Sequence, residues 1–362
     1  MKKKITAILM ILILGIIYLF SGKVINKLYL RGYEKEKIQG KDRYETIIQS
    51  GEKIWKNPKK AILMSTNEVG DAINAVPYSY NMNMPLLLTE TKELPADIYS
   101  YIKDNKLEEV YIVGGINKVS KPVERNINRM GIKTTRIIGE SKKGVNILFA
   151  QKVIEKTKSK SMFVIFDGKN GYSIGVSLLG KASEKGIPIL TANESNIYNV
   201  IDFAKKNKIE KTYVIGRYDD LNSVIDKLLP NVERISGKNK FEVNRNVVEK
   251  FYDMKKIDKV YITKGGTLIK GKTLNIGEFV NGIAVAPILA KTNQPLLIND
   301  INYLQKDTKD FIDKYNIKKI CTVGFEMEKT NLINLSYKQS QIISSIIIII
   351  MMIVIAYRAL RV

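Results

Sequence analysis

Short apolar runs alternate with amphipathic stretches along most of the chain. In residues 38–135 the apolar runs occupy 61–65, 85–89, 110–113 and 134–138. The stretches between them place apolar side chains at helical spacing, over 44–55, 71–81, 94–105 and 120–130. Nearly continuous apolar strands are typical of parallel sheets that helices cover on both faces. The pattern therefore predicts an α/β fold made of βαβ units.

The same series of landmarks occurs three times, at intervals of about 100 residues. The fullest copy begins with the segment Gly-Lys-Asp-Arg-Tyr-Glu-Thr at residues 40–46, which returns in altered form from Gly139 and from Gly237. In every copy a proline opens an apolar run and a later strand ends in glycine, at Pro85, Pro188 and Pro295 and at Gly114, Gly216 and Gly324. The repeats predict three tandem subdomains, at residues 38–135, 136–233 and 234–336.

Both ends of the sequence are apolar. Three lysines precede an uncharged stretch at residues 5–22, and a second apolar run at 342–357 precedes two arginines. We predict an N-terminal signal anchor at 1–22, a linker at 23–37, and a C-terminal transmembrane helix with a short basic tail at 337–362. The positive-inside rule then places both termini in the cytoplasm and the repeats outside the membrane. A cleaved signal peptide is the alternative for the first segment.

The side chains that most enzymes use are scarce. The 362 residues include no histidine and a single cysteine, Cys321, which excludes a histidine base, an internal disulfide and a zinc site of the usual kind. Dinucleotide, Walker and nucleophile-elbow motifs are also missing. Toprim-like domains share the predicted architecture, but they need acidic residues where repeat 1 has Ser65 and Gly114 at strand ends. We expect no cofactor, no metal and no enzyme activity.

The large positive charge does not by itself identify a ligand. The chain has 59 Lys+Arg against 36 Asp+Glu, a formal net charge of +23. Many lysines occur as dispersed pairs, which fits a polyanion-binding surface and ordinary solvated lysines equally well. Nucleic acid would suit the charge, but the predicted outward topology and the lack of interleaved aromatic residues argue against it.

The ordered motifs resemble the cell wall binding repeat 2 family. The resemblance rests on residues 40–46, 71–75, 85–89 and 113–115 and extends over about residues 38–335. It implies three Rossmann-like, Toprim-like subdomains in a pseudo-threefold arrangement, on the extracytoplasmic side of a Gram-positive cell. It also implies non-covalent attachment to an anionic cell wall polysaccharide. Repeat 2 departs from the family pattern and is degenerate, since it lacks the Asp-Arg-Tyr-Glu-Thr run.

The candidate polymer-binding residues lie in or near the repeated segments. Arginine and lysine suit anionic groups, and arginine adds a planar fork of donors. The alternative for Arg43 is an internal salt bridge, and the alternative for Asp71 is an N-cap of the following helix. The candidates are Lys41, Arg43, Asp71, Lys142, Lys143 and Lys238.

These expectations combine into a membrane-anchored, non-catalytic wall-binding protein whose affinity should fall with salt. Two other functions stay open: an envelope assembly factor that contacts another membrane protein, and a cryptic wall-polymer enzyme.

Overall fold

The computed structural model describes residues 33–139, 144–166, 169–217, 225–266, 268–269 and 273–327, together with residues 342, 345, 346 and 349. No helix in this described part is long and apolar enough to cross a membrane. The predicted anchor at 1–22 lies outside it, as does the predicted span at 337–362 apart from the last four positions named.

The chain divides into two compact units. The smaller comprises Met1–Glu34, Ile301–Lys314 and Glu326–Val362, and its described part includes helix α12 (Lys306–Lys314). The larger comprises Lys35–Asp300 and Tyr315–Phe325 and contains the three sheets. Both the strands and the helices expected for repeat 1 are present there within a few residues of their predicted bounds.

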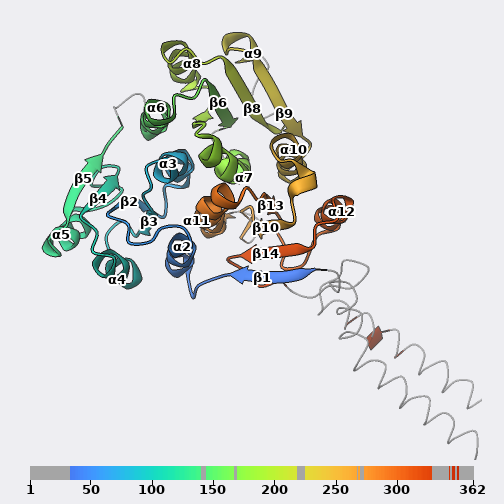
Figure 1. The fold of residues 1–362 in the computed structure, drawn as a ribbon, viewed down its shortest axis with the longest axis horizontal. Helices are drawn as coiled ribbons and strands as arrows, with labels where there is room; N and C mark the ends of the chain where they lie inside the picture. Colours follow the sequence, from blue (N-terminus) through green and yellow to red (C-terminus); the bar gives the residue numbers. More distant parts are fainter. Residues whose placement is uncertain are drawn as a thin grey trace, which may run out of the picture. The chain divides into compact units, whose positions relative to one another are not determined.

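Repeats 1 and 2 each form a four-stranded sheet, and repeat 3 supplies three strands of a third, with helices beside each sheet (Figure 1). Repeat 1 contains α2 (Arg43–Glu52), β2 (Lys60–Ser65), α3 (Val69–Asn81), β3 (Leu86–Thr89), α4 (Ala96–Asp104), β4 (Glu109–Val113), α5 (Lys121–Arg129) and β5 (Lys133–Ile137). Repeat 2 contains α6 (Gly144–Thr157), β6 (Ser161–Phe166), α7 (Lys169–Lys185), β7 (Ile189–Ala192), α8 (Ile197–Lys206), β8 (Lys211–Arg217), α9 (Ile225–Leu228) and β9 (Val232–Gly237). Repeat 3 contains α10 (Lys240–Phe251), the 3-10 helix η1 (Met254–Lys256), β10 (Lys259–Thr263), the hairpin β11 (Leu268–Ile269) and β12 (Thr273–Leu274), α11 (Ile276–Thr292), β13 (Leu296–Ile298) and β14 (Lys319–Val323).

The strand order is the same in all three sheets. Sheet 1 is ordered β3-β2-β4-β5, sheet 2 is ordered β7-β6-β8-β9, and sheet 3 is ordered β13-β10-β14-β1. Within these three sheets, the strand pairs formed inside one repeat are all parallel, which confirms the predicted α/β class. The central strands β2, β6 and β10 are almost wholly buried, as continuous apolar runs require.

The fourth strand of sheet 3 comes from the other end of the repeat region. Strand β1 (Glu34–Ile38) pairs with β14, and the Gly324 N–H donates to the Ile38 carbonyl at 2.9 Å. In repeat 1 the Gly114 N–H donates to the Ile137 carbonyl in the same way, at 2.8 Å. Residues 34–37, assigned to a linker from the sequence, are therefore a strand. Their Glu-Lys-Glu-Lys pattern is exposed and carries no apolar signal.

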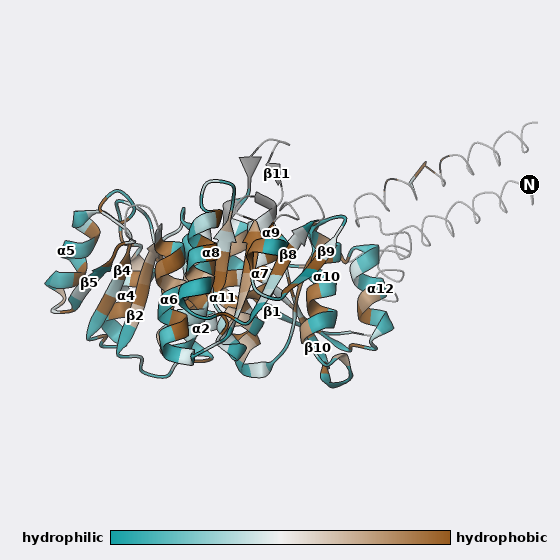
Figure 2. Cartoon of the chain, turned by 90° about the horizontal axis from the view of Figure 1, so that it is seen from above, coloured by the Kyte–Doolittle hydropathy of each residue, from teal (hydrophilic) through white to brown (hydrophobic). Residues whose placement is uncertain are grey.

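Three central helices pack against one another and hold the repeats together. Helix α11 contacts α7 and α3, and α3 contacts α7. The first helix of each repeat packs on the central helix of a neighbouring repeat: α2 on α11, α6 on α3 and α10 on α7. In Figure 2, helix α5 carries both hydrophilic and hydrophobic residues, and its buried side chains are those of Val123 and Ile127.

Many lysines near the starts of strands pair with carboxylates of the same sheet. Glu109 on β4 is the clearest case, because Lys60 on β2 and Lys133 on β5 reach it at 2.9 and 3.3 Å. Sheets 2 and 3 have similar pairs: Lys211 with Glu233, Lys259 with Glu36 and Lys319 with Asp258. Some of the lysines therefore form ion pairs with carboxylates of the protein itself.

The environment of Glu109 makes its contribution to stability depend on pH. Its side chain is 10% exposed, and its pKa falls to about 2, chiefly through the hydrogen bond from Lys60. Burial works in the opposite direction, and hydrogen bonds from Thr135, Tyr111 and Lys133 add to the lowering.

Replacing Glu109 with glutamine should lower the free energy of unfolding by about 1 kcal/mol at pH 7. The carboxylate stabilises the fold fully above its unfolded pKa of about 4.3. That contribution is lost as the pH falls through the folded pKa of about 2. Urea unfolding curves should therefore show the difference between wild type and Glu109→Gln shrinking steadily below pH 4.

The matched control is Glu108→Gln, which removes an exposed partner of Lys59. It should change the free energy of unfolding by less than about 0.5 kcal/mol at every pH. A Glu109→Gln difference that stays constant from pH 7 to pH 3 would contradict this assignment.

Candidate functional site

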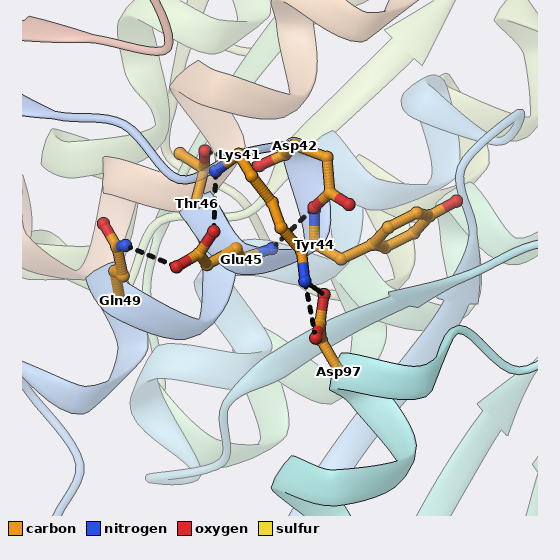
Figure 3. Close-up of polar contacts among 7 residues, drawn as sticks. All are labelled: Lys41, Asp42, Tyr44, Glu45, Thr46, Gln49 and Asp97. Carbon is orange, nitrogen blue, oxygen red and sulfur yellow. Dashed lines mark hydrogen bonds and ion pairs between the residues drawn. The ribbon is translucent and has the colours of Figure 1, made fainter.

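The repeated segment at residues 40–46 is first of all a helix cap. The Asp42 carboxylate accepts hydrogen bonds from the N–H groups of Tyr44 and Glu45, both at 2.9 Å, at the start of α2. Glu45 reaches back and accepts from the Lys41 N–H at 2.6 Å (Figure 3). This reciprocal arrangement satisfies donors that a helix start otherwise leaves unpaired. Asn239 and Glu242 repeat it at the start of α10.

The glycine that opens each segment is required by a close approach of backbone. A Cβ atom on Gly40 would lie 2.5 Å from the Glu45 Cβ and 2.7 Å from the Thr46 nitrogen. Gly237 has a similar approach to the Val243 nitrogen, at 2.8 Å, and Gly139 approaches the Val145 nitrogen at 2.5 Å. The same close approach is therefore kept at Gly139 in repeat 2, although the residues that follow it in the sequence have changed.

Two of the predicted binding residues, Lys41 and Lys238, occupy equivalent positions after the glycine. The Lys41 ammonium pairs with the Asp97 carboxylate on α4 at 2.9 Å, and this hydrogen bond raises the pKa of Lys41 (Figure 3). The lysine side chain is 65% exposed, so the pair contributes little to stability. Lys238 is exposed, and its N–H donates to Glu242.

Arg43 lines a polar cleft between repeats 1 and 3. The cleft has a volume of about 380 Å³ and lies where the N-termini of α2 and α11 meet the carboxyl ends of β10 and β14. Its lining residues from repeat 1 are Gln39, Gly40, Lys41, Asp42, Arg43 and Thr46; those from repeat 3 are Lys264, Asn275, Gly277, Glu278, Asn281, Gly324 and Phe325.

The guanidinium of Arg43 makes no ion pair within the described part of the chain. Among the described residues, the internal salt bridge considered as the alternative for Arg43 is therefore wrong. The two acidic residues nearest to Arg43 in the sequence have other partners, since Asp42 caps α2 and Glu45 accepts a hydrogen bond from the Lys41 N–H. The side chain instead lies near Gly277, at the first turn of α11.

The opposite wall of the cleft contributes a further cation and several polar groups. Lys264 follows β10, and its ammonium lies 3.9 Å from the buried Glu278 carboxylate. Asn275 precedes α11 without making a side-chain cap, so that helix start lacks the capping bond found in α2. Asn281 lies against Gly324, where a Cβ would fall 2.0 Å from the amide, and the φ of +75° at Gly324 also favours glycine.

Asp71 is neither an N-cap nor part of this cleft. Helix α3 begins at Val69, so Asp71 falls in its first turn and the capping position belongs to Glu68. The Asp71 carboxylate pairs with Lys118 at 2.6 Å, and Glu68 pairs with the same ammonium at 2.7 Å. Burial alone would lower the pKa of Lys118, but the two carboxylates raise it above its ordinary value.

The remaining candidates, Lys142 and Lys143, lie outside the described residues. Of the predicted set, the structure brings together only Lys41 and Arg43. Sequence analysis missed Lys264 and Asn275, which lie in a loop segment without periodic pattern. The register between repeats was the one available signal, since Lys264 stands at the position that Ser65, the last residue of β2, holds in repeat 1.

Chemically, the cleft can hold an anion. Two helix N-termini, an arginine and two lysines line it, against the acids Asp42 and Glu278. Arginine can donate two parallel hydrogen bonds to a carboxylate or phosphate. No group of three or more histidine, cysteine or acidic residues is placed to hold a metal ion in the part of the chain that the structure describes.

Replacing Asp42 with alanine should lower the free energy of unfolding by about 1 kcal/mol, because two N–H groups of α2 lose their acceptor. Replacing Arg43 with alanine should change it by less than about 0.5 kcal/mol, because the guanidinium makes no ion pair there. Urea unfolding of the two variants checks both values. Equal destabilisation by both would show that Arg43 has a structural role.

Comparisons with known proteins support the resemblance seen in the motifs. The family model described as Cell wall binding domain 2 (CWB2) matches residues 37–124 and 234–333. These regions correspond to repeats 1 and 3, and residues 125–233 lie outside both. Together they cover more than half of the 362 residues.

Two curated relatives come from Bacillus subtilis (strain 168). N-acetylmuramoyl-L-alanine amidase LytC is 27% identical over 290 residues, which is 80% of this chain and 55% of LytC. The amidase enhancer is 24% identical over 233 residues, which is 64% of this chain and 31% of the relative. The chain thus spans about half or less of the length of these proteins.

A solved structure, Cwp6 from Clostridium difficile, shares the fold. It aligns with a TM-score of 0.70 at 22% identity, over 82% of this chain and 46% of Cwp6. The motifs, the three sheets of equal strand order and the two matched regions lead to one conclusion: this chain belongs to the Cell wall binding domain 2 (CWB2) family.

Proposed function

We propose that this protein is a non-catalytic cell-wall-binding protein that holds an anionic wall polysaccharide in the cleft between repeats 1 and 3. The observation that carries the proposal is the Arg43 guanidinium, which lines a polar cleft of about 380 Å³ without an ion-pair partner among the described residues. A carboxylate or phosphate group of the polymer would accept its paired donors.

The neighbouring groups support the same ligand chemistry. Lys41 and Lys264 line the cleft, and both have an acidic partner that leaves some of the ammonium donors available. The start of α11 adds a partial positive charge, because its first N–H groups lack a side-chain cap. Family membership favours a polymer of the cell wall over other polyanions.

The proposal includes attachment to the membrane through the apolar segments at 1–22 and 337–362, with the repeats facing the wall. Their charge flanks and lengths support it. Fractionation tests it: the protein should stay with membranes through a high-salt and carbonate wash and leave them only with detergent. Release by salt alone would contradict an anchor.

Binding of the full-length protein to isolated wall polysaccharide should weaken steeply as salt rises. Charge contacts with a polyanion are screened, with a Debye length of about 10 Å at 0.1 M salt and about 3 Å at 1 M. Sedimentation with the insoluble wall at increasing sodium chloride measures this directly.

Equal retention at low and high salt, or none at either, would contradict the charge mechanism. Wall from which the anionic polysaccharide has been removed is the matched control, and it should retain little protein at any salt concentration. Release of soluble fragments from intact wall would instead indicate a wall-polymer enzyme.

A further inference from the structure

The three repeats are related by sequence, but the surfaces that they present to one another differ in charge. We propose that only the cleft between repeats 1 and 3 takes the anionic group of the polymer, so that each molecule has one binding site and not three. This inference rests on the proposed function and specifies its stoichiometry.

Cations at equivalent positions in repeats 1 and 3 differ in their partners. Arg43 and Lys240 both stand three residues after the glycine of their repeats. The Lys240 ammonium is already used, because it pairs with Asp300 at 2.5 Å and donates to the Gly265 carbonyl at 2.9 Å. It is bound within its own repeat, whereas Arg43 faces the cleft. Lys142, at the same position in repeat 2, lies outside the described residues.

The residues that face Arg43 across the cleft have counterparts in repeat 1. Sheet register makes Ile62 equivalent to Tyr261, since they pair with Leu86 and Leu296, the residues after the two prolines. By this alignment Lys264 corresponds to Ser65. Counting back from the prolines, Asn281 corresponds to Asp71.

The charge therefore differs between the two walls. Repeat 3 presents Lys264, Glu278 and the neutral Asn281, where repeat 1 presents the neutral Ser65 and the two acids Glu68 and Asp71. In repeat 1 two carboxylates, Glu68 and Asp71, both pair with the ammonium of Lys118, at 2.7 and 2.6 Å. A further anion brought there would meet like charge and would have to compete for Lys118.

The cleft lies next to the contact between strand β1 and sheet 3. Its repeat 1 residues follow β1 directly, and its repeat 3 residues include Gly324, whose N–H donates to Ile38 on β1. The pairing of β1 with sheet 3 therefore helps to hold the two walls of the site together. A ligand that bridges its two walls favours that paired state by mass action.

The test uses the full-length protein and three probes. Soluble fragments of poly(glycerol phosphate) supply phosphodiesters, oligogalacturonate supplies carboxylates, and fragments of isolated wall polysaccharide supply the native chemistry. Titration calorimetry gives affinity and stoichiometry for each. We expect about one short fragment per protein for at least one probe, and the probe that binds identifies the kind of anion.

Three variants then locate the site. Arg43→Ala should lose about tenfold or more in affinity, the amount expected for a charge-assisted bidentate contact. Arg43→Lys should recover part of that loss because it keeps the charge without the fork. Lys240→Gln should stay within about threefold of wild type, even though it removes the ion pair to Asp300. Thermal unfolding of each variant verifies that it is folded.

The outcomes separate the inference from the function on which it rests. Binding of three fragments, or equal losses of affinity in Arg43→Ala and Lys240→Gln, would overturn the single site while leaving wall binding intact. No binding of any probe by the folded wild type would overturn both.

Discussion

The close packing of α7 against α11 is the contact on which the larger unit depends. Glycines make it possible: a Cβ on Gly282 would lie 2.0 Å from the Val176 Cγ1, and one on Gly180 would lie 2.6 Å from the Leu289 Cβ. Side chains there would force the helices apart or into strained rotamers. Because α3 contacts both helices, all three sheets are joined through this centre.

The cleft between repeats 1 and 3 follows from the packing of α2 on α11. Helix α2 rests on α11, so the starts of these two helices come together at the carboxyl ends of sheet 3. Ligands of open parallel sheets commonly bind at such an edge, where loops and helix N-termini converge. The cap formed by Asp42 and Glu45 then fixes the turn that carries Arg43 into the cleft.

Much of the fold could be predicted from the sequence because buried parallel strands have a strong signal. The runs at 61–65 and 85–89 are apolar apart from their last residues, Ser65 and Thr89, and they correspond to β2 and β3. Strand β1 could not be found that way, because it is an exposed edge strand with alternating charges whose pairing depends on a partner at residues 319–323. The pattern of residues around β1 gives no information about a partner strand so far away in the sequence.

The site was harder to predict than the fold. The sequence singled out Arg43 and Lys41, because they stand beside a repeated glycine, but the N-cap considered as the alternative for Asp71 is wrong. Helix α3 starts two residues before Asp71, which places the carboxylate within reach of Lys118. Lys264 was missed because only the fold brings its loop opposite α2. Which cations are already paired is a property of tertiary structure, and this pairing distinguishes Arg43 from Lys240.

Chemical footprinting of arginines tests most directly whether the cleft between repeats 1 and 3 binds the polymer. Phenylglyoxal modification of the full-length protein, read by peptide mass spectrometry, reports the accessibility of each guanidinium. The account predicts that wall polysaccharide slows modification of Arg43 several-fold and leaves the exposed Arg125 and Arg129 on α5 unchanged. Unchanged modification of Arg43 with the polymer bound would contradict it.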